Sequence, residues 1–210
     1  MEYEVRYYFN TIKKDEIISK LKSINALTMK KRCYEKTSQF DHPSINNSFY
    51  SKEIDGRFRI RITKNDDISK CKVSWKRRIK STTETEVNKE EEVELNIKYE
   101  EYENLMFIIN NVLKMKNIES YERYRTIFIN DEIEIAVDEY PFGIALEIEN
   151  KSDSYSPEEV VKKWVKKIGL DISKSYRLSW DDKYRELCNA QGIKQYNHVT
   201  FDLPMPQVID

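Results

Sequence analysis

Pairs of acidic side chains recur at alternate positions in the sequence. Glu2 and Glu4 form one pair, Glu147 and Glu149 form another, and Asp138 precedes the second pair by a few residues. Carboxylate oxygens are the ligands that Mg²⁺ and Mn²⁺ prefer in proteins. This acidic set therefore predicts a site for a divalent metal ion.

Basic side chains show the same alternate spacing in other segments. The basic set consists of Arg6, Arg59, Arg61, Lys76, Arg78, Arg123 and Arg125. Arginine forks and lysine ammonium groups suit phosphate oxygens. A metal-complexed polyphosphate needs both kinds of group, and a metal-bound water can then serve as the nucleophile. A single pair of this kind is common, so the prediction depends on several pairs occurring in separate segments.

Length and composition limit the classes of function. The 210 residues suffice for one domain with a sizeable core. The net charge of -1 argues against a broad basic surface for duplex nucleic acid. Three cysteines without CxxC spacing and two histidines argue against a zinc site and are typical of reduced thiols in a cytoplasm. No apolar run approaches the ~20 residues of a membrane span, and no secretory signal is expected.

The charged pairs lie in segments where apolar and polar residues alternate, which is typical of β-strands with one buried face. We expect strands at 2–9, 31–40, 57–63, 71–79, 86–95, 121–129, 132–138 and 144–150. Apolar residues at helical spacing predict helices at 13–24, 98–115, 156–170 and 180–190. We interpret residues 1–190 as a single domain and residues 191–210, which contain prolines, as an irregular or disordered C-terminal tail.

The expected helices restrict where the charged strand faces can lie. The helices must bury their apolar stripes, so they cover the apolar face of the sheet. The charged face is then either an open surface or the inside of a closed barrel of about eight strands. A charged interior is costly unless its charges pair with one another and with a charged ligand. The run Glu90–Glu92 fits either arrangement, and Trp180 is expected to pack on the outer face or the covering helices.

Several stretches, in the same order, resemble the CYTH family, the triphosphate tunnel metalloenzymes. "EYEVRYYF" resembles the family's ExExK opening, with Arg6 where lysine is usual, and "FDHPSINNSFYSKEIDGRFRIRIT" resembles the stretch that leads into its LRxR strand. "VSWKRRI" resembles the KxR strand, "EEEVEL" the acidic strand after it, and "ERYRTIF" the next basic strand. "IEIAVDEYPFGIALEIE" resembles the late hairpin, and "IGLDISKSYRLSW" the closing segment. The resemblance covers residues 1–187.

The resemblance implies an α+β fold: an eight-stranded antiparallel β-barrel with a polar, charged interior and helices packed on its outside. Its tunnel would bind a triphosphate with Mg²⁺ or Mn²⁺. By position, the metal ligands would be Glu2, Glu4, Glu147 and Glu149, with Asp138 and Glu92 assisting. The basic set would bind phosphates, and Lys174 and Arg177 would close one end of the tunnel. Arg6 keeps the charge of the usual lysine but changes the geometry.

The resemblance leaves more than one reaction open. One is hydrolysis of inorganic triphosphate, a nucleoside or organic triphosphate, or the 5′-triphosphate of RNA. The alternative is a class IV adenylyl cyclase that makes cyclic AMP and pyrophosphate from ATP. Hydrolysis is favoured, because a cyclase also needs a nucleoside pocket, for which Tyr7, Tyr34 and Phe49 are the aromatic candidates. A further alternative is a non-catalytic polyphosphate- or nucleotide-binding module. The sequence determines neither the substrate nor the oligomeric state.

Overall fold

The computed structural model describes residues 2–49, 56–79, 87–153 and 156–209. Residue 86, the first residue of one expected strand, lies outside these ranges. Residues 50–55, within a stretch that resembles the CYTH family, also lie outside them. None of the helices in the described part of the chain has the length and apolar character that a membrane span requires.

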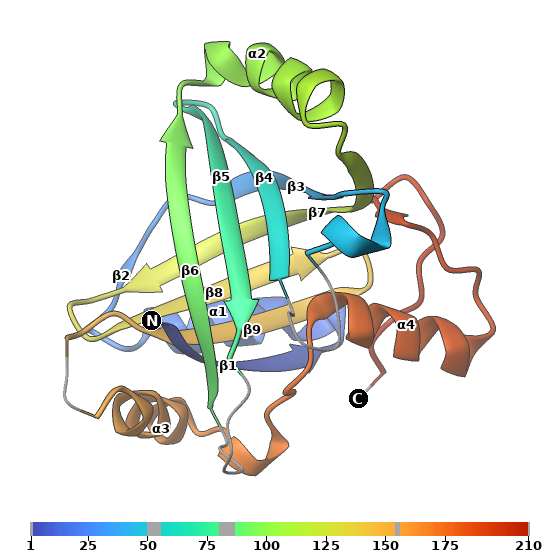
Figure 1. Ribbon diagram of the computed structural model, residues 1–210. Coiled ribbons are helices and arrows are strands. Elements are labelled where there is room, and N and C mark those ends of the chain that lie inside the picture. Colours follow the sequence, from blue (N-terminus) through green and yellow to red (C-terminus); the bar gives the residue numbers. More distant parts are fainter. Residues whose placement is uncertain (1, 50–55, 80–86, 154–155, 210) are drawn as a thin grey trace.

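Eight antiparallel strands form a closed barrel (Figure 1). The strands are β1 (Glu2–Phe9), β3 (Cys33–Asp41), β4 (Gly56–Lys64), β5 (Ser69–Arg78), β6 (Asn88–Ile97), β7 (Lys116–Ile129), β8 (Ile133–Tyr140) and β9 (Gly143–Asn150). Neighbours follow the order β7-β3-β4-β5-β6-β1-β9-β8, and the ring closes because β8 also pairs with β7. Two short strands, β2 (Thr28–Met29) and β10 (His198–Val199), extend the sheet beside β7. The predicted fold class is therefore confirmed.

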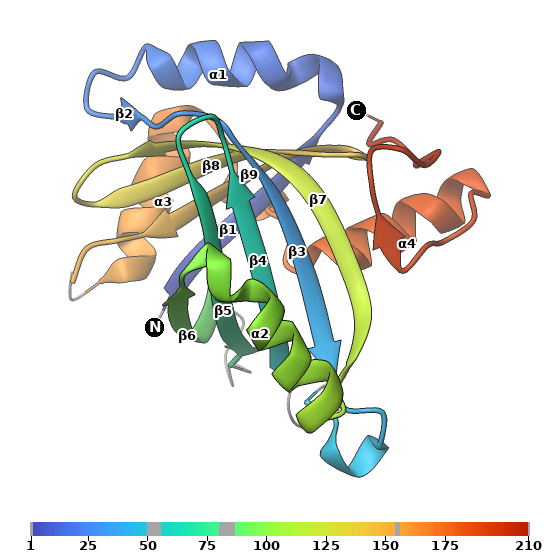
Figure 2. The ribbon, with the colours of Figure 1, turned by 90° about the horizontal axis from the view of Figure 1, so that it is seen from above.

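The helices pack on the outside of this barrel, as the sequence predicted. They are α1 (Lys14–Lys22), α2 (Tyr102–Phe107), α3 (Pro157–Ile168) and α4 (Trp180–Gln191). Figure 2 shows α1 running across the outer face of β8. Helix α3 has Pro157 in its first turn and ends at Gly169, whose φ of 74° is the left-handed conformation that glycine adopts readily. Its apolar stripe buries Trp164 against the outer side of the barrel.

The helix expected at 98–115 is interrupted. A 3-10 turn at Tyr99–Glu101 precedes α2, and a π-helical turn at Ile108–Val112 follows it. Lys114, two residues beyond the π-helical turn, is a non-glycine residue with a φ of 57°. This geometry allows both Ile109 and Met115 to pack on the outer face of β4 and β5, so packing overrides the regular helical spacing of the sequence.

The alternation along each strand separates an apolar outside from a charged inside. On β1, Val5 and Tyr7 belong to the core between the barrel and the helices, whereas Glu4 and Arg6 line the interior. The main hydrophobic core therefore lies between the sheet and α1 and α3 rather than inside the barrel. This arrangement leaves the interior for polar groups.

The C-terminal segment from residue 191 is irregular apart from β10, as expected, but it is packed against the barrel. Val199 and Val208 are buried, at 0% and 5% exposure. The Val208 amide donates to the Phe142 carbonyl at 2.8 Å, and the Asn10 side chain donates to the Val208 carbonyl at 3.0 Å. These contacts attach the segment to the outside of the barrel near α4, so the alternative of a disordered end is wrong for the residues described.

Candidate functional site

The interior of the barrel is a cavity lined almost entirely by polar and charged side chains. The cavity has a volume of about 120 Å³. The predicted ligands that line it are Glu2, Glu4, Arg6, Arg59, Arg61, Lys76, Arg78, Glu92, Arg123, Arg125, Glu147 and Glu149. The fold thus brings acidic and basic groups from separate strands into one enclosed space.

Three predicted site residues are not among those lining the cavity. Asp138 is completely buried behind it, where it binds two arginines. Lys174 and Arg177 lie in the segment between α3 and α4, outside the lining set. That segment touches β1 through its backbone, because the Tyr176 amide donates to the Arg6 carbonyl at 2.7 Å. The structure therefore does not place Lys174 or Arg177 at an end of the cavity.

The cavity also contains residues that the sequence analysis did not assign to the site. They are Arg57, Lys72, Glu90, Glu94, Tyr121, Glu134, Tyr140, Lys151, Ser179 and Trp180, of which the sequence leaves Glu90 open between the surface and the interior. Several share the strand phase of predicted ligands: Arg57 alternates with Arg59, and Glu90 with Glu92. The phase of each strand was therefore a signal that could have identified them. Ser179 and Trp180 carried no such signal, because they lie at the start of a helix.

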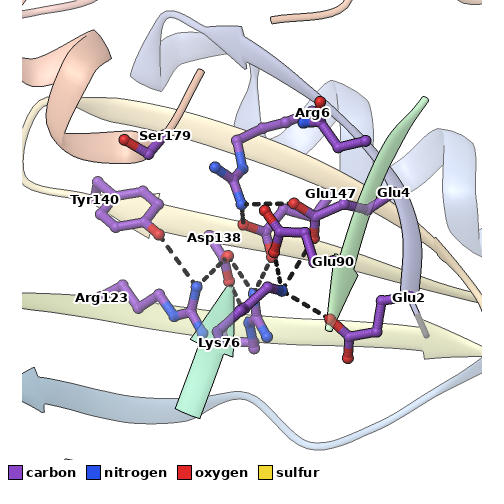
Figure 3. Close-up of polar contacts among 12 residues, drawn as sticks. Glu2, Glu4, Arg6, Lys76, Glu90, Arg123, Asp138, Tyr140, Glu147 and Ser179 are labelled. Atoms are coloured by element: carbon purple, nitrogen blue, oxygen red, sulfur yellow. Dashed lines mark hydrogen bonds and ion pairs between the residues drawn. The ribbon is translucent and has the colours of Figure 1, made fainter. Parts of the chain in front are cut away.

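An acidic cluster forms where β1 meets β6. Glu2, Glu4 and Glu90 have carboxylate oxygens that all lie within 4.8 Å of one another. Glu2 is the register partner of Glu90, and Figure 3 shows the side chains of the three glutamates around Lys76. Glu90 Oε2 is buried and has no hydrogen-bond partner among the described residues. Glu90 Oε2 is instead in an ion pair with Lys76 Nζ at 2.7 Å. Three converging carboxylates fit a divalent cation, which accepts oxygen ligands without the directional demands of a hydrogen bond.

The second predicted acidic pair does not join this cluster. Glu147 binds Arg6 at 2.6 Å and also binds Arg125, while Glu149 binds Lys151 at 2.7 Å. The grouping therefore differs from the expected metal set, because Glu90 takes the place beside Glu2 and Glu4 that the sequence assigned to Glu147.

Two carboxyl groups near the acidic cluster hold protons unusually tightly. Burial raises the pKa of Glu92 to about 8, helped by a hydrogen bond with Glu2. Burial also raises the pKa of Glu149 to about 7, and the charge of Glu2 adds to this. In Glu2 itself burial acts upward, but the hydrogen bond from Glu92 and the charge of Lys76 outweigh it and lower the pKa to about 2. Glu2 is thus ionised next to Glu92 and Glu149, which keep their protons to a higher pH than ordinary glutamates.

Strand β4 supplies a row of arginines to the cavity. Arg59 is 9% exposed, and its Nε donates to Gln39 Oε1 at 3.3 Å. Among the described residues it has no carboxylate partner. Burial lowers the pKa of Arg59, and the charges of Arg57 and Arg61 lower it further. A buried guanidinium beside two others is stabilised by an anion, so this part of the cavity suits phosphate oxygens.

A chain of ion pairs connects the far side of the barrel with the acidic cluster. Arg123 donates to Glu35 from Nε at 2.8 Å, to Asp138 at 2.7 Å and to the Tyr140 hydroxyl at 3.1 Å. Arg125 donates to both oxygens of Asp138, each at 2.6 Å. From there the chain continues through Glu147, Arg6 and Glu4. Buried charges are tolerated when they are paired and hydrogen-bonded in this way.

Aromatic side chains border one part of the cavity. Trp180, the first residue of α4, packs on Tyr121 with ring centroids 4.4 Å apart, and it stacks parallel to Tyr140 at 6.4 Å. From the sequence, Trp180 is expected to pack on the outer face or on the covering helices. It packs with Tyr184 and Leu187 of helix α4 in one hydrophobic cluster, and it also lines one part of the cavity. A capping box between Ser179 and Asp182 fixes the start of this helix.

The aromatic residues expected to form a nucleoside pocket lie elsewhere. Tyr7 is buried in the core between the barrel and the helices. Phe49 packs against Trp75 at 5.1 Å and Tyr34 against Tyr124 at 5.6 Å, and neither lines the cavity.

Comparisons with known proteins place the fold. No family model and no curated protein matches the sequence. The solved structure of the PH1819 protein from Pyrococcus horikoshii OT3 superposes with a TM-score of 0.64 at 22% identity, covering 89% of this chain and 99% of that one. A candidate adenylate cyclase from Vibrio parahaemolyticus gives a TM-score of 0.61 at 15% identity, covering 86% and 95%.

A further structure, of the candidate adenylyl cyclase HpAC1 from Hippeastrum, gives a TM-score of 0.59 at 16% identity and covers 89% of this chain and 96% of that one. That protein is described as having a dominant triphosphatase activity. The chain therefore has the fold of these candidate adenylyl cyclases, which agrees with the resemblance of its motifs to the CYTH family.

Proposed function

We propose that this protein is a divalent-metal-dependent triphosphatase whose substrate lies inside the barrel. The observation that supports the proposal most directly is the pairing of two sites in one cavity. Glu2, Glu4 and Glu90 converge on one side, and Arg59 lies on β4 without a carboxylate partner among the described residues. A metal-complexed polyphosphate carries the complementary charges.

The side chains divide the work of binding in this proposal. Glu2, Glu4 and Glu90 would hold Mg²⁺ or Mn²⁺, which supplies charge neutralisation and a bound water of lowered pKa. Arg59 and Arg61 would orient the phosphates and stabilise the charge that develops during transfer. Glu4, Glu90 and Arg59 are buried, so solvent screens their interactions less than it would at the surface.

Hydrolysis fits the geometry better than cyclisation. A cyclase must hold a nucleoside as well as the triphosphate, and Tyr7, Tyr34 and Phe49 lie outside the cavity. The aromatic residues that border it, Tyr121, Tyr140 and Trp180, are buried against one another at 5% exposure or less, which leaves no open ring face for a base. The description of HpAC1 as mainly a triphosphatase supports the same choice by analogy of fold. The substrate class stays broad: inorganic triphosphate, a nucleoside or organic triphosphate, or an RNA 5′ end.

The test incubates purified protein with tripolyphosphate, ATP or a 5′-triphosphate RNA, each with Mg²⁺ or Mn²⁺, and resolves the products. We expect orthophosphate release that is lost in Glu4→Gln. The matched control is Glu91→Gln, because Glu91 lies on β6 next to Glu90 but points outward, where it pairs with Arg77 at 2.8 Å. This control should keep its activity.

The other outcomes are equally specific. Cyclic AMP with pyrophosphate would assign the protein as a cyclase. Tripolyphosphate that binds without product, and binds equally well in Glu4→Gln, would indicate a non-catalytic binding module.

A further inference from the structure

Lys76 lies at the border between the basic and the acidic part of the cavity. On β5 its register partner toward β4 is Arg57, and its partner toward β6 is Glu92. Arginines line the cavity from β4, and glutamates line it from β6. A flexible lysine stem at this border can direct its ammonium group toward either neighbour.

In the structure the ammonium group lies among the acidic cluster (Figure 3). Lys76 Nζ is 2.8 Å from Glu2 Oε2, 2.7 Å from Glu90 Oε2 and 3.6 Å from Glu4 Oε2. These are the same three carboxylates that converge within 4.8 Å. The side chain of Lys76 is 14% exposed, so the interaction is only partly screened by solvent. The ammonium group thus occupies the space that a divalent cation would use.

The fit of the ammonium group to this space is incomplete. The contact with Glu90 is close, yet Glu90 Oε2 has no hydrogen-bond partner among the described residues. The contact between Lys76 and Glu90 is therefore an ion pair without good hydrogen-bond geometry. A divalent cation has no such directional requirement and carries twice the charge.

We propose that Lys76 competes with the divalent cation for Glu2, Glu4 and Glu90, and that an anion bound beside the β4 arginines releases it. The lysine and the cation repel each other, so both cannot share these carboxylates. Without an anion, the charges of Arg57 and Arg59 oppose movement of the ammonium group toward β4. Metal and anion binding therefore promote each other, and by linkage the coupling is equal in both directions.

The metal in this inference comes from the proposed function, so the test measures binding rather than turnover. Mn²⁺ affinity is measured by electron paramagnetic resonance in chloride buffer for wild type, Lys76→Met and Lys72→Met. Lys72 lies on the same strand and the same face, but it pairs with Glu94, outside the cluster. It controls for the loss of one positive charge from the cavity.

We expect Lys76→Met to bind Mn²⁺ at least about tenfold more tightly than wild type, because its three carboxylates lose their competitor. Lys72→Met should change much less. Lys76→Met should also have a lower melting temperature in chelator, and Mn²⁺ should restore it by replacing the missing charge. Equal affinity in wild type and Lys76→Met would overturn the proposal.

A second measurement on wild type does not depend on the folding of a variant. Sulfate, an anion with little affinity for Mn²⁺, replaces chloride at constant ionic strength. Sulfate should tighten Mn²⁺ binding by wild type and leave Lys76→Met unchanged. An equal sulfate effect in both proteins, or none in wild type, would contradict the competition.

The two proposals fail in distinguishable ways. Tight Mn²⁺ binding by Lys76→Met without turnover of any triphosphate by wild type would reject the triphosphatase and leave the competition intact. Turnover by wild type with no effect of Lys76→Met on Mn²⁺ affinity would reject the competition alone. No Mn²⁺ binding by any variant would reject both.

Discussion

Two guanidinium nitrogens of Arg123 face the same carboxylate oxygen of Glu35: Nε lies 2.8 Å and Nη2 lies 2.7 Å from Glu35 Oε2. Both side chains are buried, at 7% exposure for Glu35 and 2% for Arg123. Burial acts to raise the pKa of Glu35, but the charges of Arg123, Arg61 and Arg125 hold it far below the usual value. Glu35 therefore remains a carboxylate that keeps three cavity arginines together.

Glu35→Gln should destabilise the protein strongly, because it removes one of the two carboxylates that balance the buried guanidinium of Arg123 and leaves only Asp138. We expect a loss of about 3–5 kcal/mol in the free energy of unfolding, measured by urea denaturation. Glu91→Gln, an exposed pair on the barrel's outer face, should lose less than about 1 kcal/mol. Similar losses in the two variants would mean that the Glu35–Arg123 pair makes no special contribution.

The sequence predicted the barrel better than it predicted these partnerships. Alternation fixes which side chains share a face, so the arginines of β4 and the glutamates of β1 were placed correctly inside. It does not fix the register between strands, which decides that Glu90 and not Glu147 joins Glu2 and Glu4. Pairing across the barrel depends on the closed fold as a whole.

Two other residues, Glu35 and Trp180, could not be assigned to the site from the sequence for the same reason: their partners come from distant segments. Glu35 alternates with uncharged Thr37 and Gln39, so nothing in its own strand marked it as part of the site. Trp180 borders the cavity because the start of α4 packs on Tyr121 of β7 and Tyr140 of β8. Such long-range contacts leave no local pattern in the sequence.

Tyr121 should ionise near neutral pH. Burial raises its pKa, but the charges of Arg123, Arg61 and Arg59 outweigh burial and lower it to about 7. Ultraviolet difference absorption should show one tyrosinate forming within about one unit of pH 7. The signal should disappear in Tyr121→Phe. It should persist in Tyr140→Phe, because burial raises the pKa of Tyr140 instead. A signal that survives in Tyr121→Phe would refute this assignment.

Trp180→Ala should both destabilise the protein and open one part of the cavity. Trp180 is 5% exposed and packs on Tyr121 and Tyr140. We expect a loss of about 3–5 kcal/mol in the free energy of unfolding, which is typical of removing a buried aromatic side chain. Trp180→Phe keeps an aromatic ring and should lose clearly less. The prediction fails if chemical denaturation gives the two variants the same stability.

The stability of the metal-free protein should fall as pH rises from about 5 to about 7. Burial raises the pKa of Glu92 to about 8, and that of Glu149 and Glu119 to about 7. In this window the folded protein keeps these protons, whereas the unfolded chain, with glutamate pKa values near 4.3, has released them. A folded state that binds more protons loses stability as pH rises.

Other titrating groups do not reverse this direction within the window. Burial acts to raise the pKa values of Glu35 and Glu147, but the charges of neighbouring arginines outweigh it and hold both pKa values far below normal. The stability that these two ionised carboxylates add to the folded protein is therefore complete above about pH 5 and is lost only in acid. Tyr121 begins to add stability only above about pH 7, because its pKa is about 7 when folded and about 10 when unfolded. The three glutamates therefore determine the slope.

A divalent cation should counteract this decline. Mn²⁺ at the acidic cluster favours the ionised forms of nearby Glu92 and Glu149, whose pKa values are raised to about 8 and about 7, so it binds more tightly at pH 7 than at pH 5. Differential scanning fluorimetry in chelator and in Mn²⁺ should show the melting temperature falling with pH in chelator, with a Mn²⁺ increment that grows over the same range. Glu92→Gln should flatten the decline, while Glu91→Gln should leave it unchanged. A melting temperature that rises with pH in chelator would show that Glu92, Glu149 and Glu119 titrate near their ordinary values.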